Sequence, residues 1–188
     1  MPSLFDEKNA LRLQVRQKGA SLPSDYFHTS SQNIRENLFS TPAWQKAQTV
    51  LLYASIGLEP DTHSILQSAF VSPKRVALPC CLPKGMLEAR EVHSLEALTP
   101  KSFGILEPGS DLPFIAPHTL DLVIVPCVAM DVRFHRLGHG GGYYDRYLDT
   151  ISCPVICLCH EAFLLKSIPT EPWDKAVSMI ITGERILS

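Results

Sequence analysis

The chain is organised around one glycine-rich stretch, Arg136-Leu137-Gly138-His139-Gly140-Gly141-Gly142-Tyr143-Tyr144-Asp145-Arg146-Tyr147-Leu148. Glycine lacks a Cβ, so it adopts positive φ angles and lets other groups approach the backbone closely. Successive N–H groups of such a loop can form a concavity that binds anions. The residues from Tyr143 to about Asp149 predict a helix directly after the glycines, and amides that lead into a helix are typical of a phosphate site. The alternative is a flexible turn between a strand and a helix.

The charged residues of this stretch favour the phosphate site. Arg136 precedes the glycines and Arg146 follows them, so both add positive charge. Asp145 is a carboxylate beside a predicted anion site, which is typical of a divalent cation that bridges carboxylate and phosphates. The spacing matches neither the dinucleotide-binding G-x-G-x-x-G pattern nor a Walker loop, which requires Gly-Lys-Ser/Thr.

Length and composition indicate one ordinary globular domain over residues 1–188. The chain has 188 residues, 45% of them hydrophobic and 19% charged, with a formal net charge of −2. A chain of this length and composition can bury a sizeable core without disulfide or metal cross-links. It has no excess of positive charge that would indicate binding to nucleic acid. The sequence has no apolar signal core at its start and no apolar run of membrane-spanning length. We therefore expect a cytoplasmic protein with neither a nucleic-acid nor a membrane partner.

Six cysteines raise the question of a metal site or disulfides. Cys153, Cys157 and Cys159 precede His160, but the paired Cys-x2-4-Cys spacing of structural zinc sites is missing. The segment 154–159 alternates like a buried strand, which places Cys157 and Cys159 on one face. We expect these cysteines to be buried and reduced.

Periodicity predicts a three-layer α/β fold with two N-terminal helices. Helices are expected over residues 4–19, 24–39 (capped by Ser24), 42–46 and 62–70, and strands over residues 49–54, 74–79, 86–92, 120–126, 154–159 and 177–182. The nearly continuous apolar runs at 49–54 and 120–126 are typical of strands covered on both faces of a parallel sheet. A hairpin-like return at Gly85 would make this mostly parallel sheet mixed.

Two sets of polar residues lie where a ligand could reach them. The spacing of Lys8, Arg12 and Arg16 places them on one face of the first predicted helix. These side chains could bind phosphate groups, or they could be solvated surface charges without a specific role. Glu59 follows the strand at 49–54, and ligands of α/β sheets bind beyond the carboxyl ends of strands. For Asp61 and Thr62 we favour helix capping.

The full pattern, Asp131 with Arg136-Leu137-Gly138-x-Gly-Gly-Gly-Tyr-Tyr-Asp-Arg-x-Leu, resembles the signature of the 5-formyltetrahydrofolate cyclo-ligases, also called methenyltetrahydrofolate synthetases. The resemblance extends from Lys8 to Thr182, although only the segment from Arg136 to Arg146 is specific. It implies an architecture related to the sheets of ribose-phosphate isomerases and CoA-transferases. It also implies an enzyme that cyclises 5-formyltetrahydrofolate to 5,10-methenyltetrahydrofolate with ATP and Mg²⁺, releasing ADP and phosphate.

The resemblance also implies roles for particular residues. Those expected at ATP are Lys8, Asn9, Ala10, Leu11, Arg12, Arg136, Leu137, Gly138, His139, Gly140, Gly141, Gly142, Tyr143 and Tyr144. Those expected at the folate are Ala54, Glu59, His139, Gly140, Gly141, Gly142 and Tyr143. Lys8, Arg136 and Tyr144 would act in catalysis, while Asp145 and Asp174 would hold Mg²⁺. Without the resemblance, Asp174 would be interpreted as a turn residue.

In the reaction that the resemblance implies, the formyl oxygen attacks the γ-phosphorus of ATP, N10 attacks the phosphorylated imidate, and phosphate leaves. Such phosphoryl transfer requires mainly positioning and charge neutralisation from the protein. No nucleophilic side chain is needed.

The chain departs from the family pattern at Phe134 (expected Gly), Cys127 (Gly), Met130 (Phe) and Phe163 (Gln). Phe134 could strain the entry to the glycine loop, and Phe163 would remove a polar group close to the site. These two departures motivate an alternative, a non-catalytic module that binds nucleotide or folate. An unrelated phosphate-ester enzyme on the same fold is a third possibility. A monomer is the expected state, with a homodimer as the alternative.

Overall fold

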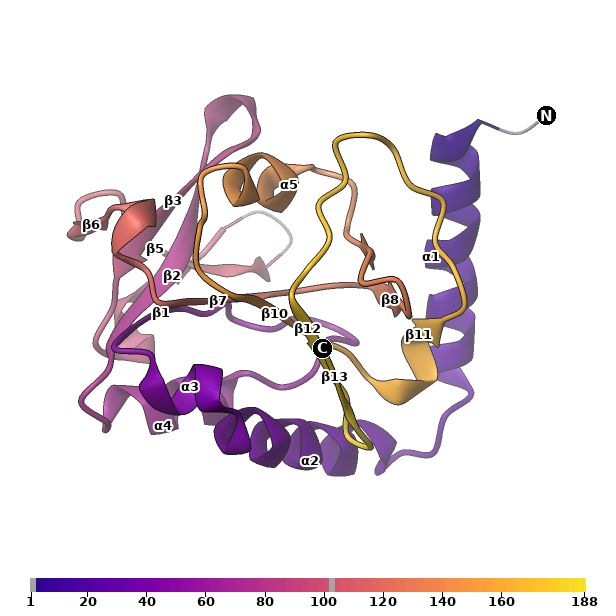
Figure 1. Ribbon diagram of the computed structural model, residues 1–188, viewed down its shortest axis with the longest axis horizontal. Helices are drawn as coiled ribbons and strands as arrows, with labels where there is room; N and C mark the ends of the chain where they lie inside the picture. Colours follow the sequence, from indigo (N-terminus) through magenta and orange to yellow (C-terminus); the bar gives the residue numbers. More distant parts are fainter. Residues whose placement is uncertain (1–2, 102–103) are drawn as a thin grey trace.

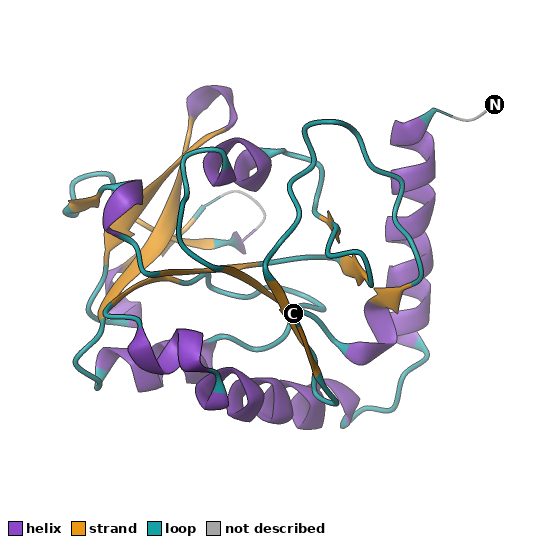
Figure 2. Ribbon diagram, viewed as in Figure 1, coloured by secondary structure: helices purple, strands orange, loops and turns teal. Residues whose placement is uncertain are grey.

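The computed structural model describes residues 3–101 and 104–188, which build an eight-stranded sheet with helices on both faces (Figures 1 and 2). The strands run in the order β13-β12-β10-β7-β1-β2-β3-β6. Their bounds are β1 Thr49–Leu51, β2 Arg75–Leu82, β3 Met86–Glu91, β6 Phe114–Ile115, β7 Leu122–Val125, β10 Val155–Leu158, β12 Met179–Ile181 and β13 Ile186–Leu187. The five strands from β12 to β2 are parallel, whereas β13, β3 and β6 pair antiparallel at the two edges.

The α-helices of the described residues are α1 Leu4–Ala20, α2 Tyr26–Ser40, α3 Pro42–Lys46, α4 His63–Phe70 and α5 Tyr143–Leu148. Short 3-10 helices cover Pro83–Gly85, Leu95–Ala97, Pro117–Thr119 and Glu161–Phe163. In Figure 1, α2, α3 and α4 lie below the sheet, α5 lies above it and α1 stands at one end. None of the helices within the described ranges has the length and hydropathy needed to cross a lipid bilayer.

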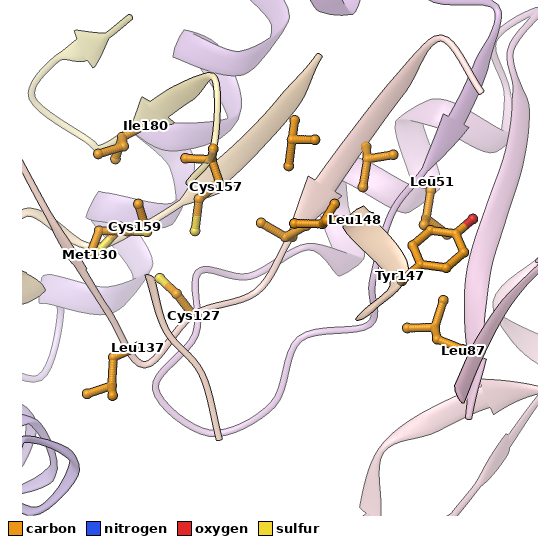
Figure 3. Packing of buried hydrophobic residues seen from close by; sticks show 14 of the residues in the cluster. Leu51, Leu87, Cys127, Met130, Leu137, Tyr147, Leu148, Cys157, Cys159 and Ile180 are labelled. Carbon is orange, nitrogen blue, oxygen red and sulfur yellow. The ribbon is translucent and has the colours of Figure 1, made fainter. Parts of the chain in front are cut away.

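Each face of the sheet has its own hydrophobic core, because successive side chains of a strand point to opposite sides. Leu51, Val123 and Cys157 belong to the core under α1 and α5, together with Val15, Tyr147 and Leu148 (Figure 3). Val50, Leu122 and Ile156 point the other way, into a core with residues of α2, α3 and α4. All four residues of β7 are buried, as expected for a strand covered on both faces.

Two smaller sheets complete the fold. β8 (Ala129–Asp131) pairs with β9 (Arg136–Leu137) and with β11 (Leu164–Leu165), and this small sheet lies beside α1. β4 (Leu98–Pro100) pairs with β5 (Leu106–Pro108). The short chain between β8 and β9 and the glycine loop after β9 carry the site described below.

The predicted architecture is confirmed, including the mixed sheet, since β2 and β3 form an antiparallel hairpin through Gly85. Three details were wrong. The second helix begins at Tyr26 after Asp25, so Ser24 is not its cap. The strand at 177–182 is not the last, because β13 follows it. Residues 106–108, which no predicted helix or strand covers, form the strand β5.

The prediction of buried cysteines agrees with the structure only in part, because Cys81 is exposed and Cys153 is half-buried. Cys157 and Cys159 are buried in the same core, so they share a face as the alternation indicated. All six cysteines are free thiols.

Candidate active site

Asp131 organises the turn between β8 and β9. It is fully buried, and its Oδ1 accepts the N–H groups of Arg133 and His135 at 2.9 and 3.0 Å. Its Oδ2 accepts the N–H of Ile168 at 2.8 Å. Burial alone would raise the pKa of Asp131, but these N–H donors lower it below its usual value. An ionised Asp131 thus fixes the chain that leads to Arg136.

Phe134 lies in this turn with a φ of +70°, in the left-handed region that residues other than glycine rarely adopt. Its N–H donates to the carbonyl of Asp131, and its own carbonyl accepts the N–H of Val177. The expectation that a bulky residue here strains the loop entry therefore agrees with the observed backbone.

The glycine loop needs glycine at two positions, where φ is +102° (Gly140) and +64° (Gly142). Gly142 is the residue before α5, and a Cβ there would lie 2.9 Å from Nη1 of Arg146. No backbone hydrogen bond of the described residues is donated by the N–H groups of Gly140, Gly141 or Gly142. These N–H groups are therefore available to an anion, and the anion site itself stays a prediction.

Arg146 differs from its expected role as a general source of positive charge. Its Nε donates to the carbonyl of Gly85 at 2.9 Å, and its Nη2 donates to the carbonyl of Gly141 at 2.6 Å. The guanidinium thus joins the glycine loop to the β2–β3 hairpin. Its role in this structure is to hold the loop in place.

Helix α1 reaches the glycine loop through Arg12. The Arg12 Nε donates to the carbonyl of Gly138 at 2.8 Å, and its Nη1 donates to Oδ1 of Asn9 at 2.6 Å. A Cβ on Gly140 would lie 3.4 Å from Nη2 of the same guanidinium. The two segments that the sequence assigned to phosphate binding are therefore in direct contact.

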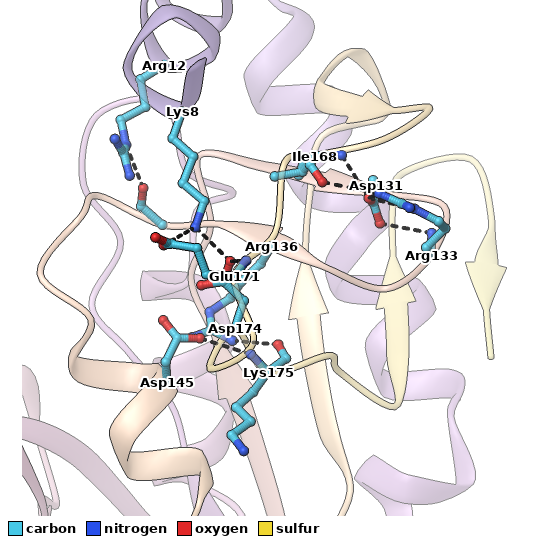
Figure 4. A network of polar contacts seen from close by, with 11 residues as sticks. Lys8, Arg12, Asp131, Arg133, Arg136, Asp145, Ile168, Glu171, Asp174 and Lys175 are labelled. Atoms are coloured by element: carbon cyan, nitrogen blue, oxygen red, sulfur yellow. Dashed lines mark hydrogen bonds and ion pairs between the residues drawn. The ribbon is translucent and has the colours of Figure 1, made fainter. Parts of the chain in front are cut away.

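Lys8 lies one turn before Arg12 and contacts the loop that carries Asp174 (Figure 4). Its Nζ is 2.6 Å from Oδ2 of Asp174 and 3.0 Å from Oε2 of Glu171. Burial alone would lower the pKa of Lys8, but the two carboxylates raise it above its ordinary value. Lys8 is consequently a fixed cation.

Arg136 and Asp145 form a second ion pair beside the first, with Nη2 of Arg136 2.6 Å from Oδ1 of Asp145 (Figure 4). The same Oδ1 accepts the N–H of Lys175 at 3.2 Å, and the Lys175 carbonyl accepts from Nη1 of Arg136 at 3.1 Å. Each predicted metal ligand is therefore paired with a predicted phosphate-binding cation.

The carboxylates of Asp145 and Asp174 suit Mg²⁺ that is shared with ATP. Both contacts to Asp145 use Oδ1 and both contacts to Asp174 use Oδ2, so each carboxylate keeps one oxygen outside these bonds. Over residues 3–101 and 104–188, no group of three or more His, Cys, Asp or Glu side chains could hold an ion. This donor set fits Mg²⁺, which commonly takes one or two carboxylates and completes its shell with phosphate and water.

A cavity of about 220 Å³ opens next to the glycine loop, between α1 and the segment that follows β1. Its lining is Arg12, Val15, Arg16, Ile56, Gly57, Leu58, Glu59, Cys127, Val128 and His139. The Glu59 carboxylate accepts the N–H of Ile56 at 2.9 Å and lies 3.0 Å from Nε2 of His139. The cavity therefore offers a mostly apolar surface with one carboxylate, close to the predicted phosphate site.

Comparison with known proteins identifies the family. The family model of the 5-formyltetrahydrofolate cyclo-ligase family matches residues 5–183. The chain belongs to this family. It is 28% identical to a probable 5-formyltetrahydrofolate cyclo-ligase of Schizosaccharomyces pombe, over 96% of this chain and 97% of the relative. It is 29% identical to the 5-formyltetrahydrofolate cyclo-ligase of Escherichia coli K12, over 92% and 98%.

The structural comparison agrees with the family model. The solution structure of Aquifex aeolicus 5,10-methenyltetrahydrofolate synthetase superposes with a TM-score of 0.83 at 29% identity, covering 96% of this chain and 91% of that chain. The cyclo-ligase fold thus spans both halves of the site, α1 and the glycine loop.

Not every residue expected at the cyclo-ligase site reaches it through its side chain. Leu137 is buried in the core, so only its backbone could contact a nucleotide. Ala10 and Leu11 line a different, wider cleft between α1 and residues 167–170. Ala54 is buried, packs in the core on the α2 side and does not line the cavity. Their nucleotide and folate contacts stay predictions.

Tyr143 and Tyr144 begin α5, directly after the glycines. Arg146 lies over the Tyr143 ring at 5.9 Å. Burial, followed by the negative charge of Glu59, raises the pKa of Tyr144 well above its ordinary value. Tyr144 therefore stays protonated near the Glu59 carboxylate and can donate a hydrogen bond.

Phe163 lies away from the proposed site. It is buried in an aromatic cluster with Phe27 and His160, at centroid distances of 6.2 and 6.0 Å. Its side chain is part of the core and does not line the cavity. One of the two motivations for a non-catalytic cyclo-ligase homologue is therefore removed.

The sequence did not single out Lys175, and it did not point to Glu171 as a partner of Lys8. Both follow from contacts between segments that are distant in the chain, which periodicity does not reveal.

Proposed function

We propose that this chain cyclises 5-formyltetrahydrofolate to 5,10-methenyltetrahydrofolate at the expense of ATP, releasing ADP and phosphate. The observation that carries the proposal is the contact of Arg12 with the Gly138 carbonyl at 2.8 Å, which brings the basic face of α1 to the glycine loop. Family membership independently favours this reaction.

The side chains at the site would act by positioning and by neutralising charge. The N–H groups of residues 140–142 and the guanidinium of Arg12 bind the triphosphate. Lys8 and Arg136 exchange their carboxylate partners for phosphate oxygens as the nucleotide enters. The formyl oxygen forms a bond to the γ-phosphorus while the bond to ADP breaks. N10 then attacks the formyl carbon and loses its proton, and the oxygen leaves within phosphate.

Asp145 and Asp174 would hold Mg²⁺ together with the phosphates, through the oxygens that they keep free. When bound, the ion neutralises the charge of the β- and γ-phosphates. Glu59 and the cavity beside His139 would take the folate. The Glu59–His139 contact closes this cavity at one side, so His139 would have to turn away, as its 58% exposed side chain permits.

An absorbance assay tests the proposed reaction and the role of Asp145 together. Wild-type protein with 5-formyltetrahydrofolate and Mg-ATP should form the methenyl chromophore, and it should form none without ATP. Asp145→Ala should lower kcat/KM by about 10²- to 10³-fold, the usual effect of losing one electrostatic contact at a transition state.

The matched control is Asp149→Ala, which removes an exposed carboxylate after α5 that pairs with Lys175 at 2.5 Å. It should leave kcat/KM within about 2-fold, because exposed ion pairs contribute little. A wild-type protein that binds ATP without forming product would overturn the proposed reaction. Equal losses in both variants would remove Asp145 from the phosphate site.

The monomeric state and the cytoplasmic location stay predictions. A mass measurement in solution alongside the activity assay tests the monomeric state.

A further inference from the structure

Glu171 is a carboxylate at the phosphate site to which the proposed reaction assigns no role. Its Oε2 lies 3.0 Å from Nζ of Lys8, and among the described residues its side chain makes no other hydrogen bond or ion pair. The turn that carries it is closed by other groups. The Asp174 N–H donates to the Glu171 carbonyl at 3.0 Å, and the Glu171 N–H donates to Oδ2 of Asp174 at 2.8 Å. The Glu171 carboxylate is therefore not needed to hold the turn.

Lys8 faces more negative charge than its one ammonium group can compensate. Its Nζ also lies 2.6 Å from Oδ2 of Asp174, so it is held between two carboxylates of the same loop (Figure 4). Arg136, by comparison, pairs with one carboxylate of the described residues, Asp145. The second carboxylate at Lys8 is thus the excess negative charge of this cluster.

Binding of Mg-ATP would leave Glu171 without a cation of its own. In the proposed reaction Asp174 binds Mg²⁺ and Lys8 binds phosphate oxygens. A carboxylate beside a triphosphate is unfavourable, because like charges repel most strongly where water screens them poorly. The side chains of Lys8 and Glu171 are 13% and 29% exposed, so water reaches this contact only in part. Glu171 and the phosphates therefore require the same ammonium group.

We propose that Glu171 is a positioning residue that holds the Lys8 ammonium in the empty site and competes with the nucleotide phosphates for it. In the free protein, Glu171 keeps the Lys8 side chain directed at the loop of the site. When a nucleotide leaves, the carboxylate binds the ammonium again. Glu171 thus lowers the affinity of the site for every ligand that carries phosphates. This inference rests on the proposed function and deepens the role of Lys8 in it.

Glu171→Gln removes the negative charge, keeps the shape of the side chain and is the direct test. We expect the dissociation constant of Mg-ATP, measured by calorimetry without folate, to fall about 3- to 10-fold, slightly more than a fully exposed ion pair would give. ADP and inorganic tripolyphosphate should show the same gain, whereas adenosine should show none. KM for ATP should fall in parallel while KM for the folate is unchanged. A merely structural role of Glu171 would have the opposite sign, since a disturbed site binds ATP more weakly.

Two further variants complete the test. Glu171→Asp keeps the negative charge, so it should bind Mg-ATP like the wild-type protein. The matched control is Glu91→Gln, which breaks a 2.6 Å contact with Arg75. Arg75 begins the parallel strand β2, so this pair lies at the opposite end of the sheet from a site beyond the carboxyl ends of the strands. The dissociation constant of Mg-ATP should be unchanged in Glu91→Gln.

Unchanged or weaker binding of Mg-ATP by Glu171→Gln would overturn the inference. An equal gain in Glu171→Asp, in Glu91→Gln or with adenosine would also overturn it, because the effect would then not arise from competition between a charge and phosphate. Wild-type protein that binds Mg-ATP without turnover would refute only the proposed reaction, since the ratio of dissociation constants still tests Glu171. Wild-type protein that binds no Mg-ATP would refute both.

Discussion

At the scale of single residues, Phe134 has a backbone conformation that is unfavourable for a residue with a side chain. Its φ of +70° costs about 1–2 kcal/mol for a residue with a Cβ, whereas glycine adopts it freely. The ring is partly buried against the core, so replacing it changes packing as well as strain. A comparison of two variants that both lack the ring separates these effects.

We expect Phe134→Gly to be more stable than Phe134→Ala by about 1 kcal/mol, the reverse of the order found in helices. Chemical denaturation of both variants measures this difference. Gly104 has a φ of +75°, and an added Cβ would meet no atom within 4 Å among the described residues beyond its chain neighbours. It provides a calibration, since Gly104→Ala should cost a similar amount. Equal stability of the two Phe134 variants would show that the turn relaxes to a negative φ.

At the scale of elements, His160 connects β10 to α2. It is fully buried, its Nδ1 lies 2.7 Å from Oγ of Ser30, and the rings of Tyr26, Phe27 and Phe163 surround it. Burial lowers the pKa of His160 to about 4. The unfolded chain, with a pKa of about 6.5, takes up a proton at this residue before the folded chain does.

Above pH 6.5 the His160 ring is neutral in both the folded and the unfolded chain, so it does not affect the free energy of unfolding. As the pH drops from about 6.5 to 4, only the unfolded chain gains a proton at His160, and the free energy of unfolding falls. The loss reaches about 3 kcal/mol at 1.36 kcal/mol per pKa unit. His160→Asn, whose amide can replace Nδ1, should lose stability less steeply across this window in denaturation at several pH values. His28→Asn, at an exposed site on α2, is the control. Parallel curves for wild type and His160→Asn would contradict the assignment.

The elements that the sequence predicted well are those with their own signal. β7 was visible as the apolar run at 120–126, because both faces of a central strand are buried, and β10 was visible as the alternating segment at 154–159. β9 and β13 have two residues each, and their pairing depends on partners elsewhere in the fold. No local pattern could have indicated them.

The same distinction holds for the site. The glycine loop and the basic face of α1 were predictable because their residue types lie close together in the sequence. The pairing of Lys8 with Asp174 and of Arg136 with Asp145 was not, since each cation was expected at phosphate and each carboxylate at Mg²⁺. In a chain without ligand, a cluster of cations is most stable when carboxylates compensate its charge.

At the scale of the whole molecule, α1 is the least embedded major element. Only Val15 and Gly19 of its seventeen residues are buried. Polar contacts hold the rest, including a 2.6 Å bond from Lys18 Nζ to the Ala162 carbonyl and the bonds of Lys8 and Arg12 described above. We therefore expect α1 to open locally more often than the sheet.

Nucleotide that bridges α1 and the glycine loop should suppress this opening. A ligand at 100 times its dissociation constant stabilises the binding-competent state by about 2.7 kcal/mol, so hydrogen exchange of α1 amides should slow by up to about 100-fold with Mg-ATP. The exchange rates of β7 and β10 amides should change little where these amides exchange through local openings that do not disrupt the nucleotide site. Adenosine, which lacks phosphates, should not protect α1, and Arg12→Ala should abolish the effect of Mg-ATP. Protection confined to the glycine loop would mean that α1 takes no part in binding the triphosphate, and the two-sided site would have to be abandoned.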